Sequence, residues 1–217
     1  MHDDLEKVVK KHLTSEFKKP FAPFSLAAFE QLSEHVEQYL SANQTDVAAP
    51  ARYLILDSCC GVGESTVRLA AQYPDALVIG IDKSEHRVEK NDHHQPEKVE
   101  NYLVIRADLN DLWRLIAQKN WPIKKHFLLY PNPWPKSKHL QRRWHGAAVF
   151  PYIAQLSEQL IVRSNWSIYI DEFAAALKIQ GYHAEPKAYL SDEPMTPFER
   201  KYWASGQQSY QLECCFS

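Results

Sequence analysis

The stretch LDSCCGVGEST, residues 56–66, decides the fold class of this chain of 217 residues. The apolar run YLILDS (53–58) is short and bounded, which is typical of a buried strand. The segment ESTVRLAAQY (64–73) fits a helix. Gly61 and Gly63, two of only six glycines in the chain, allow a sharp turn from the strand into that helix. A strand, a glycine-containing loop and a helix together predict the first unit of an α/β fold.

Strands and helices continue to alternate along the rest of the chain. Further strands are expected at 77–82, 102–108, 126–130 and 166–171, and further helices at 109–119, 147–162 and 173–182. The segment SYQLECCF (209–216) alternates apolar and other residues, which suits an antiparallel strand. The pattern predicts a doubly wound, mostly parallel sheet with an antiparallel C-terminal strand.

Residues 1–50 are expected to form a helical N-terminal extension, and 51–217 the main domain. Phe29, Leu32 and Val36 recur at helical spacing and make one apolar face. The formal net charge is −2 and the pI is about 6.5, so any nucleic-acid binding has to come from a local basic patch. No apolar run of about 18 residues predicts a membrane span, and the start of the chain does not resemble a signal peptide. We therefore expect a cytoplasmic protein that does not bind membranes.

Acidic residues stand at the carboxyl ends of the first three expected strands, at Asp57, Asp82 and Asp108. Because the carboxyl ends of parallel strands share one edge of the sheet, these acids should line one pocket with Gly61 and Gly63. A carboxylate at Asp82 can accept the hydroxyls of a ribose. Two nucleoside-type ligands compete for this pocket, a dinucleotide such as NAD and S-adenosylmethionine. The alternative without a ligand is that these acids cap helices and turns.

S-adenosylmethionine is the preferred ligand for two reasons. Thr66 stands where a dinucleotide site wants a third small residue. Four acids, Glu64 among them, suit a cationic sulfonium better than a pyrophosphate. The four cysteines come as two adjacent pairs without a CxxC spacing, so we expect buried, reduced thiols and no metal site.

The second informative stretch is YPNPWPKSKHLQRR, residues 130–143. Its three prolines rule out regular structure directly after the fourth strand. Trp134 could stack on a base or fill the core beneath the loop. The cations either form a solvated face or contact phosphate, and their place at a strand end favours phosphate; they are Lys136, Lys138, Arg142 and Arg143.

This stretch resembles the tRNA (guanine-N7)-methyltransferases, whose motif reads F-P-D-P-W-P-K-x-R-H-x-K-R-R. YID (169–171) and TPFE (196–199) are similar to two further motifs of that family, and the resemblance runs from about residue 52 to the C-terminus. It implies a class I methyltransferase fold with a seven-stranded sheet, S-adenosylmethionine as cofactor and tRNA as substrate. It also implies substrate or catalytic roles, which fall on Asn132, Lys136, Asp171, Thr196 and Glu199.

Three features depart from the resembled pattern. Cys59 stands at the first glycine position of the loop, Asn132 replaces an aspartate, and a basic N-terminal region is not recognisable. Asn-Pro-Trp partly resembles the Asn-Pro-Pro-aromatic loop of exocyclic-amine methyltransferases, which is one alternative function. A catalytically impaired RNA-binding relative is another. A monomer and a homodimer are both compatible with the sequence.

Overall fold

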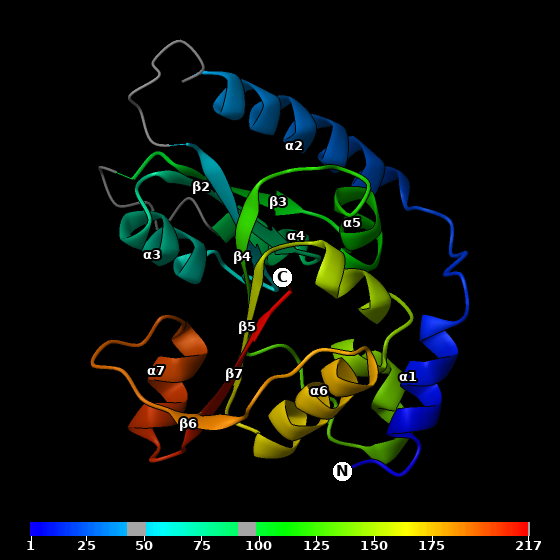
Figure 1. Cartoon of the computed structure of the whole chain (residues 1–217). Helices are drawn as coiled ribbons and strands as arrows, with labels where there is room; N and C mark the ends of the chain where they lie inside the picture. Colours follow the sequence, from blue (N-terminus) through cyan, green and yellow to red (C-terminus); the bar gives the residue numbers. More distant parts are fainter. Residues whose placement is uncertain (43–50, 91–98, 217) are drawn as a thin grey trace. The chain divides into compact units, whose positions relative to one another are not determined.

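The computed structural model describes residues 1–42, 51–90 and 99–216, and its fold is α/β (Figure 1). One sheet holds seven strands in the order β3-β2-β1-β4-β5-β7-β6. The expected mostly parallel, seven-stranded sheet with an antiparallel C-terminal strand is therefore confirmed. The chain forms two compact units, residues 20–127 and residues 1–19 with 128–217. We describe each unit by itself.

The first unit carries the glycine-containing loop. Its elements in chain order are α2 (Pro23–Ser41), β1 (Tyr53–Ser58), α3 (Glu64–Gln72), β2 (Ala76–Asp82), α4 (Glu85–Val88), β3 (Tyr102–Arg106), α5 (Leu109–Ile116) and the start of β4 (Ile123–Leu129). β1 pairs with β2, and β2 with β3, all in parallel, with Asp57 opposite Gly80 and Asp82 opposite Arg106. β2 is buried along its whole length, which explains its unbroken apolar sequence.

The start of helix α2 is fastened to the start of α5 by two hydrogen bonds. The backbone N–H of Asp108 donates to Ser25 Oγ at 3.1 Å, and the backbone N–H of Ala22 donates to Asp111 Oδ2 at 3.1 Å. The predicted apolar face of α2 is present, since Leu32 and Val36 are buried. The predicted division of the chain at residue 50 stays a prediction.

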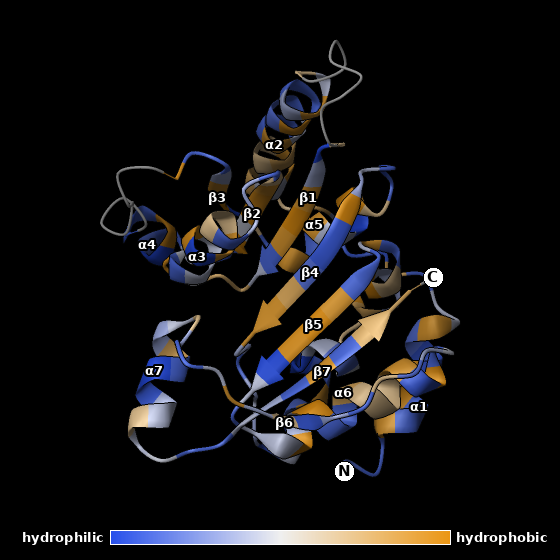
Figure 2. Ribbon diagram, turned by 60° about the vertical axis from the view of Figure 1, so that its left-hand side comes forward, coloured by the Kyte–Doolittle hydropathy of each residue, from blue (hydrophilic) through white to orange (hydrophobic). Residues whose placement is uncertain are grey.

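The second unit carries the proline-rich stretch. Its elements are α1 (Leu5–Leu13), the 3-10 helices η2 (Ser137–Arg142), η3 (Trp144–Gly146) and η4 (Phe150–Gln155), β5 (Gln159–Ser164), α6 (Ser167–Ile179), β6 (Lys187–Tyr189), α7 (Pro197–Ala204) and β7 (Ser209–Cys215). β7 is antiparallel to both β5 and β6, as the alternation of its residues predicts. Figure 2 shows the apolar middle of β5, where Leu160, Ile161 and Val162 are buried.

Two predicted elements of this unit are wrong. The helix expected over 147–162 is instead a 3-10 segment followed by β5, and the strand expected over 166–171 is the first half of α6. Pro151 lies in the first turn of η4, where a missing N–H is tolerated, so it does not end the helix. Residues 159–164 instead pair with β7. Tyr169 is buried against the aromatic rings of His145 and Phe173, so packing decides the helix against the β propensity of its residues.

None of the helices in the described part of the chain is long and apolar enough to cross a membrane. Of the four cysteines, Cys60 and Cys214 are buried as expected, Cys59 is half-buried, and Cys215 is exposed. None of these four cysteines, all of which lie in the described ranges, forms a disulfide bond.

Candidate active site

The glycine-containing loop between β1 and α3 has three residues with left-handed backbones. Cys59, Gly61 and Gly63 have φ angles of 63°, 62° and 81°. Gly63 is the N-cap of α3, and its N–H donates to Cys60 O at 3.0 Å, which closes the turn. Cys59 is not a glycine, so its conformation costs about 1–2 kcal/mol. The position of the first glycine in the resembled pattern thus requires a left-handed backbone, which Cys59 adopts at a cost in free energy.

Asp82, at the end of β2, holds this loop in place. Its Oδ2 accepts from the backbone N–H of Gly61 at 3.1 Å, and its Oδ1 accepts from the N–H of Ser84 at 2.8 Å. Arg87 Nη1 lies 3.7 Å from Oδ2. Ser84 is the N-cap of α4, although its side chain makes no capping hydrogen bond. The structure therefore brings Asp82 and Gly61 together, as the sequence predicts.

Asp57 is fully buried at the end of β1. Ser65 Oγ and Thr66 Oγ1 donate to its Oδ2 at 2.6 and 2.7 Å. Burial raises the pKa of Asp57 to about 6, and the two hydroxyl donors offset part of that effect. The second oxygen, Oδ1, is buried and has no hydrogen-bond partner among the described residues. Such an orphaned acceptor is rare and fits a donor from a bound ligand.

Asp108 does what the ligand-free alternative predicts, since it is the N-cap of α5. Its Oδ1 accepts from the backbone N–H of Asn110 at 3.0 Å. Its Oδ2 pairs with Lys83 Nζ at 3.0 Å. Sequence reasoning missed Lys83, and the signal was available, because this lysine directly follows Asp82 at the same sheet edge.

The residues of this loop fit a nucleoside-type cofactor. A Cβ at Gly61 would meet nothing within 4 Å, so there is open space directly above the loop backbone. Asp82 and Asp57 offer acceptor oxygens around it. Thr66 does not count against a dinucleotide in the way that the sequence suggests. A Cβ at Gly80 would collide with Thr66 Oγ1, so the small residue that allows close helix packing lies on β2 instead.

A buried histidine on β4, the strand next to β1 in the sheet, was not singled out from the sequence. His126 Nε2 lies 2.8 Å from Ser58 Oγ, which also accepts from Trp113 Nε1 at 3.1 Å. Burial lowers the pKa of His126 to about 3, so its ring is neutral. No local pattern reveals this contact, because His126 follows Ser58 by 68 residues.

In the second unit, the loop after β4 has an unusual backbone. Tyr130 and Trp134 have φ angles of 48° and 46°, a region that side chains rarely adopt. Asn132 is exposed, and its Oδ1 accepts from the backbone N–H of Trp134 at 3.2 Å. Strained residues of this kind concentrate at functional sites. The loop thus presents Asn132 on a short turn that its own side chain helps to fix.

Trp134 lies among surface cations and does not fill the core. The guanidinium of Arg142 lies 4.8 Å from the centre of its ring, and His139 meets it edge-on at 5.4 Å. Lys136, Lys138 and Arg142 are exposed. Partial desolvation and the charges of these three cations and Arg143 lower the pKa of His139. The local patch that the sequence predicts is therefore basic.

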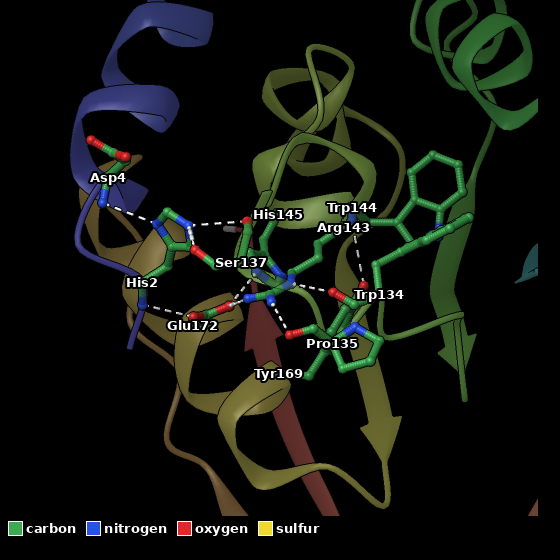
Figure 3. Close-up of polar contacts among 10 residues, drawn as sticks. All are labelled: His2, Asp4, Trp134, Pro135, Ser137, Arg143, Trp144, His145, Tyr169 and Glu172. Carbon is green, nitrogen blue, oxygen red and sulfur yellow. Dashed lines mark hydrogen bonds and ion pairs between the residues drawn. The ribbon is translucent and has the colours of Figure 1, made fainter. Parts of the chain in front are cut away.

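Arg143 differs from its predicted role, because its side chain is only 4% exposed. Its Nη1 donates to Glu172 Oε2, and its Nε and Nη2 donate to the carbonyls of Trp134 at 3.2 Å and Pro135 at 3.4 Å (Figure 3). The guanidinium is bound to oxygens of the protein, which contradicts the expected contact with phosphate. Arg143 instead fixes the backbone of the loop.

Glu172, on α6, is the centre of this polar cluster. His145 Nε2 lies 3.1 Å from the same Oε2 that Arg143 contacts, and the backbone N–H of His2 donates to Oε1 at 2.8 Å. Burial alone would raise the pKa of Glu172, but the hydrogen bonds and charges of His145 and Arg143 outweigh it and lower the pKa to about 2. The carboxylate is therefore ionised at neutral pH.

The remaining predicted residues fall into two groups. Asp171 is exposed on α6 and does not end a strand. Thr196 and Glu199 lie together: Thr196 Oγ1 accepts from the N–H of Glu199 at 3.0 Å and so caps α7. Glu199 is fully buried, and it pairs with Arg163 Nη1 at 2.5 Å and accepts from the N–H of Met195 at 2.5 Å. These contacts neutralise its charge within the unit.

Comparisons with known proteins agree with this picture. A family model described as "Putative methyltransferase" matches residues 51–212. A tRNA (guanine-N(7)-)-methyltransferase of Chlorobium phaeobacteroides is 28% identical over 149 residues, which cover 65% of this chain and 71% of that protein. One of Paracoccus denitrificans is 36% identical over 153 residues, which cover 68% of this chain and 65% of that protein.

Solved structures of similar fold are more distant in sequence. The 16S rRNA methyltransferase KamB has a TM-score of 0.59 and 18% identity, with 92% of this chain and 95% of that chain covered. A 16S rRNA (adenine(1408)-N(1))-methyltransferase from Catenulisporales acidiphilia has a TM-score of 0.58 and 13% identity, with 84% and 90% covered. These likenesses show the fold. Because the family model spans most of the chain, the protein belongs to this methyltransferase family.

Proposed function

We propose that the chain is an S-adenosylmethionine-dependent methyltransferase that modifies N7 of a guanine in tRNA, in the variable loop as the resemblance implies. The observation that carries this proposal is the loop after β4. There Asn132, Lys136, Lys138 and Arg142 are exposed, and the guanidinium of Arg142 lies over the ring of Trp134. The tRNA (guanine-N7)-methyltransferase relatives support the target base.

The cofactor side of the proposal rests on the first unit. S-adenosylmethionine, when bound, supplies an electrophilic methyl group on a sulfonium. Gly61 and Gly63 would let its nucleoside approach the backbone, and Asp57 Oδ1 and Asp82 would accept its hydrogen-bond donors. Asp108 would contribute a further acceptor, although it already caps α5. The several carboxylates favour a cationic ligand.

The base side rests on the second unit. Guanine N7 carries a lone pair and no proton, so methyl transfer needs positioning and no strong base. Trp134 would stack on a base, a contact worth about 1–3 kcal/mol. Asn132 would orient the base edge through its amide. Positive charge grows on the purine, and a carboxylate stabilises it.

Two carboxylates are candidates for that stabilisation. Asp171 is exposed and the stronger of the two, because Arg163 neutralises the buried Glu199. We assign Glu199 and Thr196 to holding the segment before α7 in its conformation. Either residue would then affect substrate binding indirectly, by positioning that segment. Lys136, Lys138 and Arg142 would contact phosphates.

The proposed place of action is the cytoplasm and the proposed partner is tRNA, bound by a monomer or homodimer. Incubation of the purified protein with bulk tRNA and isotope-labelled S-adenosylmethionine tests the activity, with the labelled nucleoside identified by mass spectrometry. We expect 7-methylguanosine. A labelled adenosine or cytidine methylated on its amine would overturn the proposal in favour of an exocyclic-amine enzyme.

Variants of the loop sharpen the same assay. Lys138→Gln should raise the KM for tRNA, while Lys201→Gln, an exposed lysine on α7, should not. Asn132→Asp should keep or raise the activity of an N7 enzyme and abolish that of an amine enzyme. If the protein transfers no methyl group and calorimetry detects no S-adenosylmethionine binding, it is an RNA-binding relative and the proposal fails.

A further inference from the structure

We propose that a groove between α1 and η2 binds the phosphate backbone of the RNA, so that the N-terminal helix forms one wall of the substrate site. The inference rests on the proposed function and adds a surface that the loop after β4 does not include. The groove has a volume of about 920 Å³ and opens to solvent. One wall is formed by α1 with the residues that precede it, and the other by η2. The lining residues are His2, Asp4, Lys7, Val8 and Lys11 on the first wall, and Ser137, Lys138, Leu140, Gln141 and Arg142 on the second.

The walls carry facing positive charges. Lys7 and Lys11 are one helical turn apart on α1, and Lys138 and Arg142 lie on η2. All four are exposed, and Asp4 is the only carboxylate in the lining. Cations gathered around one groove repel one another, and a bound polyanion removes that repulsion. The lowered pKa of His139, next to Lys138, agrees with a positive field on this side of the groove.

Helix α1 is held rigidly enough to serve as a wall. Its opposite side is anchored, since Leu5 and Val9 are buried. At its start, His2 Nε2 lies 2.8 Å from Ser137 Oγ and 3.1 Å from Ser137 O, which joins the two walls (Figure 3). The backbone N–H of His2 also reaches Glu172. A preformed groove loses little conformational entropy when it binds a ligand.

The groove is continuous with the proposed base site. Arg142 belongs to its lining and also lies 4.8 Å from the ring of Trp134. A nucleotide whose base stacks on Trp134 therefore has its neighbouring phosphates within reach of this wall. An extended nucleic-acid backbone matches a row of cations along an open groove, which is why we propose RNA as the occupant.

Neutralisation of single lysines on α1 tests the proposal. Lys7→Gln and Lys11→Gln each remove one groove cation. Lys10→Gln is the matched control, because Lys10 is exposed on the same helix but pairs with Glu6 at 2.6 Å and faces the side of Lys178. Circular dichroism and thermal unfolding establish that all variants fold. Binding of tRNA is measured by fluorescence anisotropy without cofactor, over a series of salt concentrations.

Each groove variant should weaken binding about fivefold at about 0.15 M salt and reduce the slope of log K against log salt by about 0.7–0.9. The double variant should reduce the slope by about twice as much, and Lys10→Gln should leave it unchanged. In steady-state kinetics the KM for tRNA should rise while kcat stays the same. The proposal that RNA binds in the groove would be overturned if Lys10→Gln and Lys7→Gln weakened tRNA binding equally, or if the double variant left the salt slope unchanged.

The two proposals fail in different ways. If the wild-type protein makes 7-methylguanosine and the α1 variants bind tRNA normally, the function stands and the groove is wrong. If the protein modifies another base, the function is wrong, while the loss of RNA affinity in the α1 variants still supports the groove.

Discussion

Arg143 and Glu172 form a buried ion pair between the end of the proline-rich stretch and α6. Their side chains are 4% and 1% exposed, and the same guanidinium holds the carbonyls of Trp134 and Pro135. A buried charge is stable only when it is paired and its hydrogen bonds are satisfied. Loss of either partner would therefore leave the other charge buried and unpaired, and the pair fixes the left-handed turn at Trp134 that exposes Asn132.

Breaking this pair should be costly. Glu172→Gln leaves Arg143 without a counter-charge, and we expect the free energy of unfolding to fall by about 3–5 kcal/mol. Replacement of both residues by apolar ones, Arg143→Met with Glu172→Leu, should restore part of the stability, because no charge is left unpaired but His145 and the N–H of His2 lose their acceptor. It should not restore the activity, because the loop carbonyls lose their donor. Urea unfolding and methyl transfer measure the two effects. Glu185→Gln, at an exposed site, is the control, and an equal loss there would contradict the assignment.

The same pair predicts a loss of stability in acid. The pKa of Glu172 in the folded protein is about 2, below its ordinary value of 4.5. The unfolded state therefore binds more protons between these values, and the contribution of Glu172 decreases as the pH falls from about 4.5 towards 2. Urea unfolding at several pH values should show wild type and Glu172→Gln converging there. A constant difference between them would count against this account.

Asp57 should change the free energy of unfolding with pH in the opposite direction. Its pKa is raised from 3.8 to about 6, so the folded state binds more protons than the unfolded state between these values, and stability decreases as the pH rises through them. The ionised carboxylate then costs on the order of 3 kcal/mol at neutral pH. Asp57→Asn should raise the free energy of unfolding at pH 7 and leave it nearly unchanged below about pH 4. Calorimetry should also show weaker S-adenosylmethionine binding, and unaltered affinity would remove Asp57 from the cofactor site.

Replacement of Gly80 or of Gly61 by alanine should destabilise the protein, for different reasons. Gly80→Ala places a Cβ against Thr66 Oγ1 and should cost about 1–3 kcal/mol through overpacking. Gly61→Ala meets open space, so its cost of about 1–2 kcal/mol comes from the left-handed backbone alone. Shortening Thr66 to Ala should partly rescue Gly80→Ala and do nothing for Gly61→Ala. Thermal unfolding of the two double variants tests this difference. If Thr66→Ala rescued both glycine variants, contact with Thr66 could not be the specific cause at Gly80.

Cys59 tests whether the first loop position requires glycine. Cys59→Gly relieves the left-handed strain but adds freedom to the unfolded chain, so we expect a change in stability within about 1 kcal/mol and unimpaired cofactor binding. Cys59→Val should destabilise more strongly, because a β-branched residue tolerates this conformation poorly. A higher free energy of unfolding for Cys59→Val than for the wild type would show that the loop has another conformation in solution.

Much of the site followed from local sequence. Short apolar runs ended by glycines or acids identified β1 and β2, because a strand buried on both faces needs an unbroken apolar sequence. A similar run identified β3, although its residues are only half-buried or exposed. The contact between Asp82 and Gly61 followed from parallel strands that end at one edge. The prolines of 131–135 excluded regular structure where the structure has a loop.

Other features depended on partners far along the chain. Residues 159–164 form a strand because β7 supplies their hydrogen bonds some 50 residues later, and 166–171 form a helix because Tyr169 packs on His145 and Phe173. Arg143 looked like its exposed neighbours until the fold placed Glu172 beside it. The sequence by itself determined the α/β fold, the glycine-containing loop and the basic loop, since these depend on local periodicity and backbone freedom. Only the tertiary structure decided which charges are buried and paired and which face solvent, because burial depends on packing between segments that are distant in sequence.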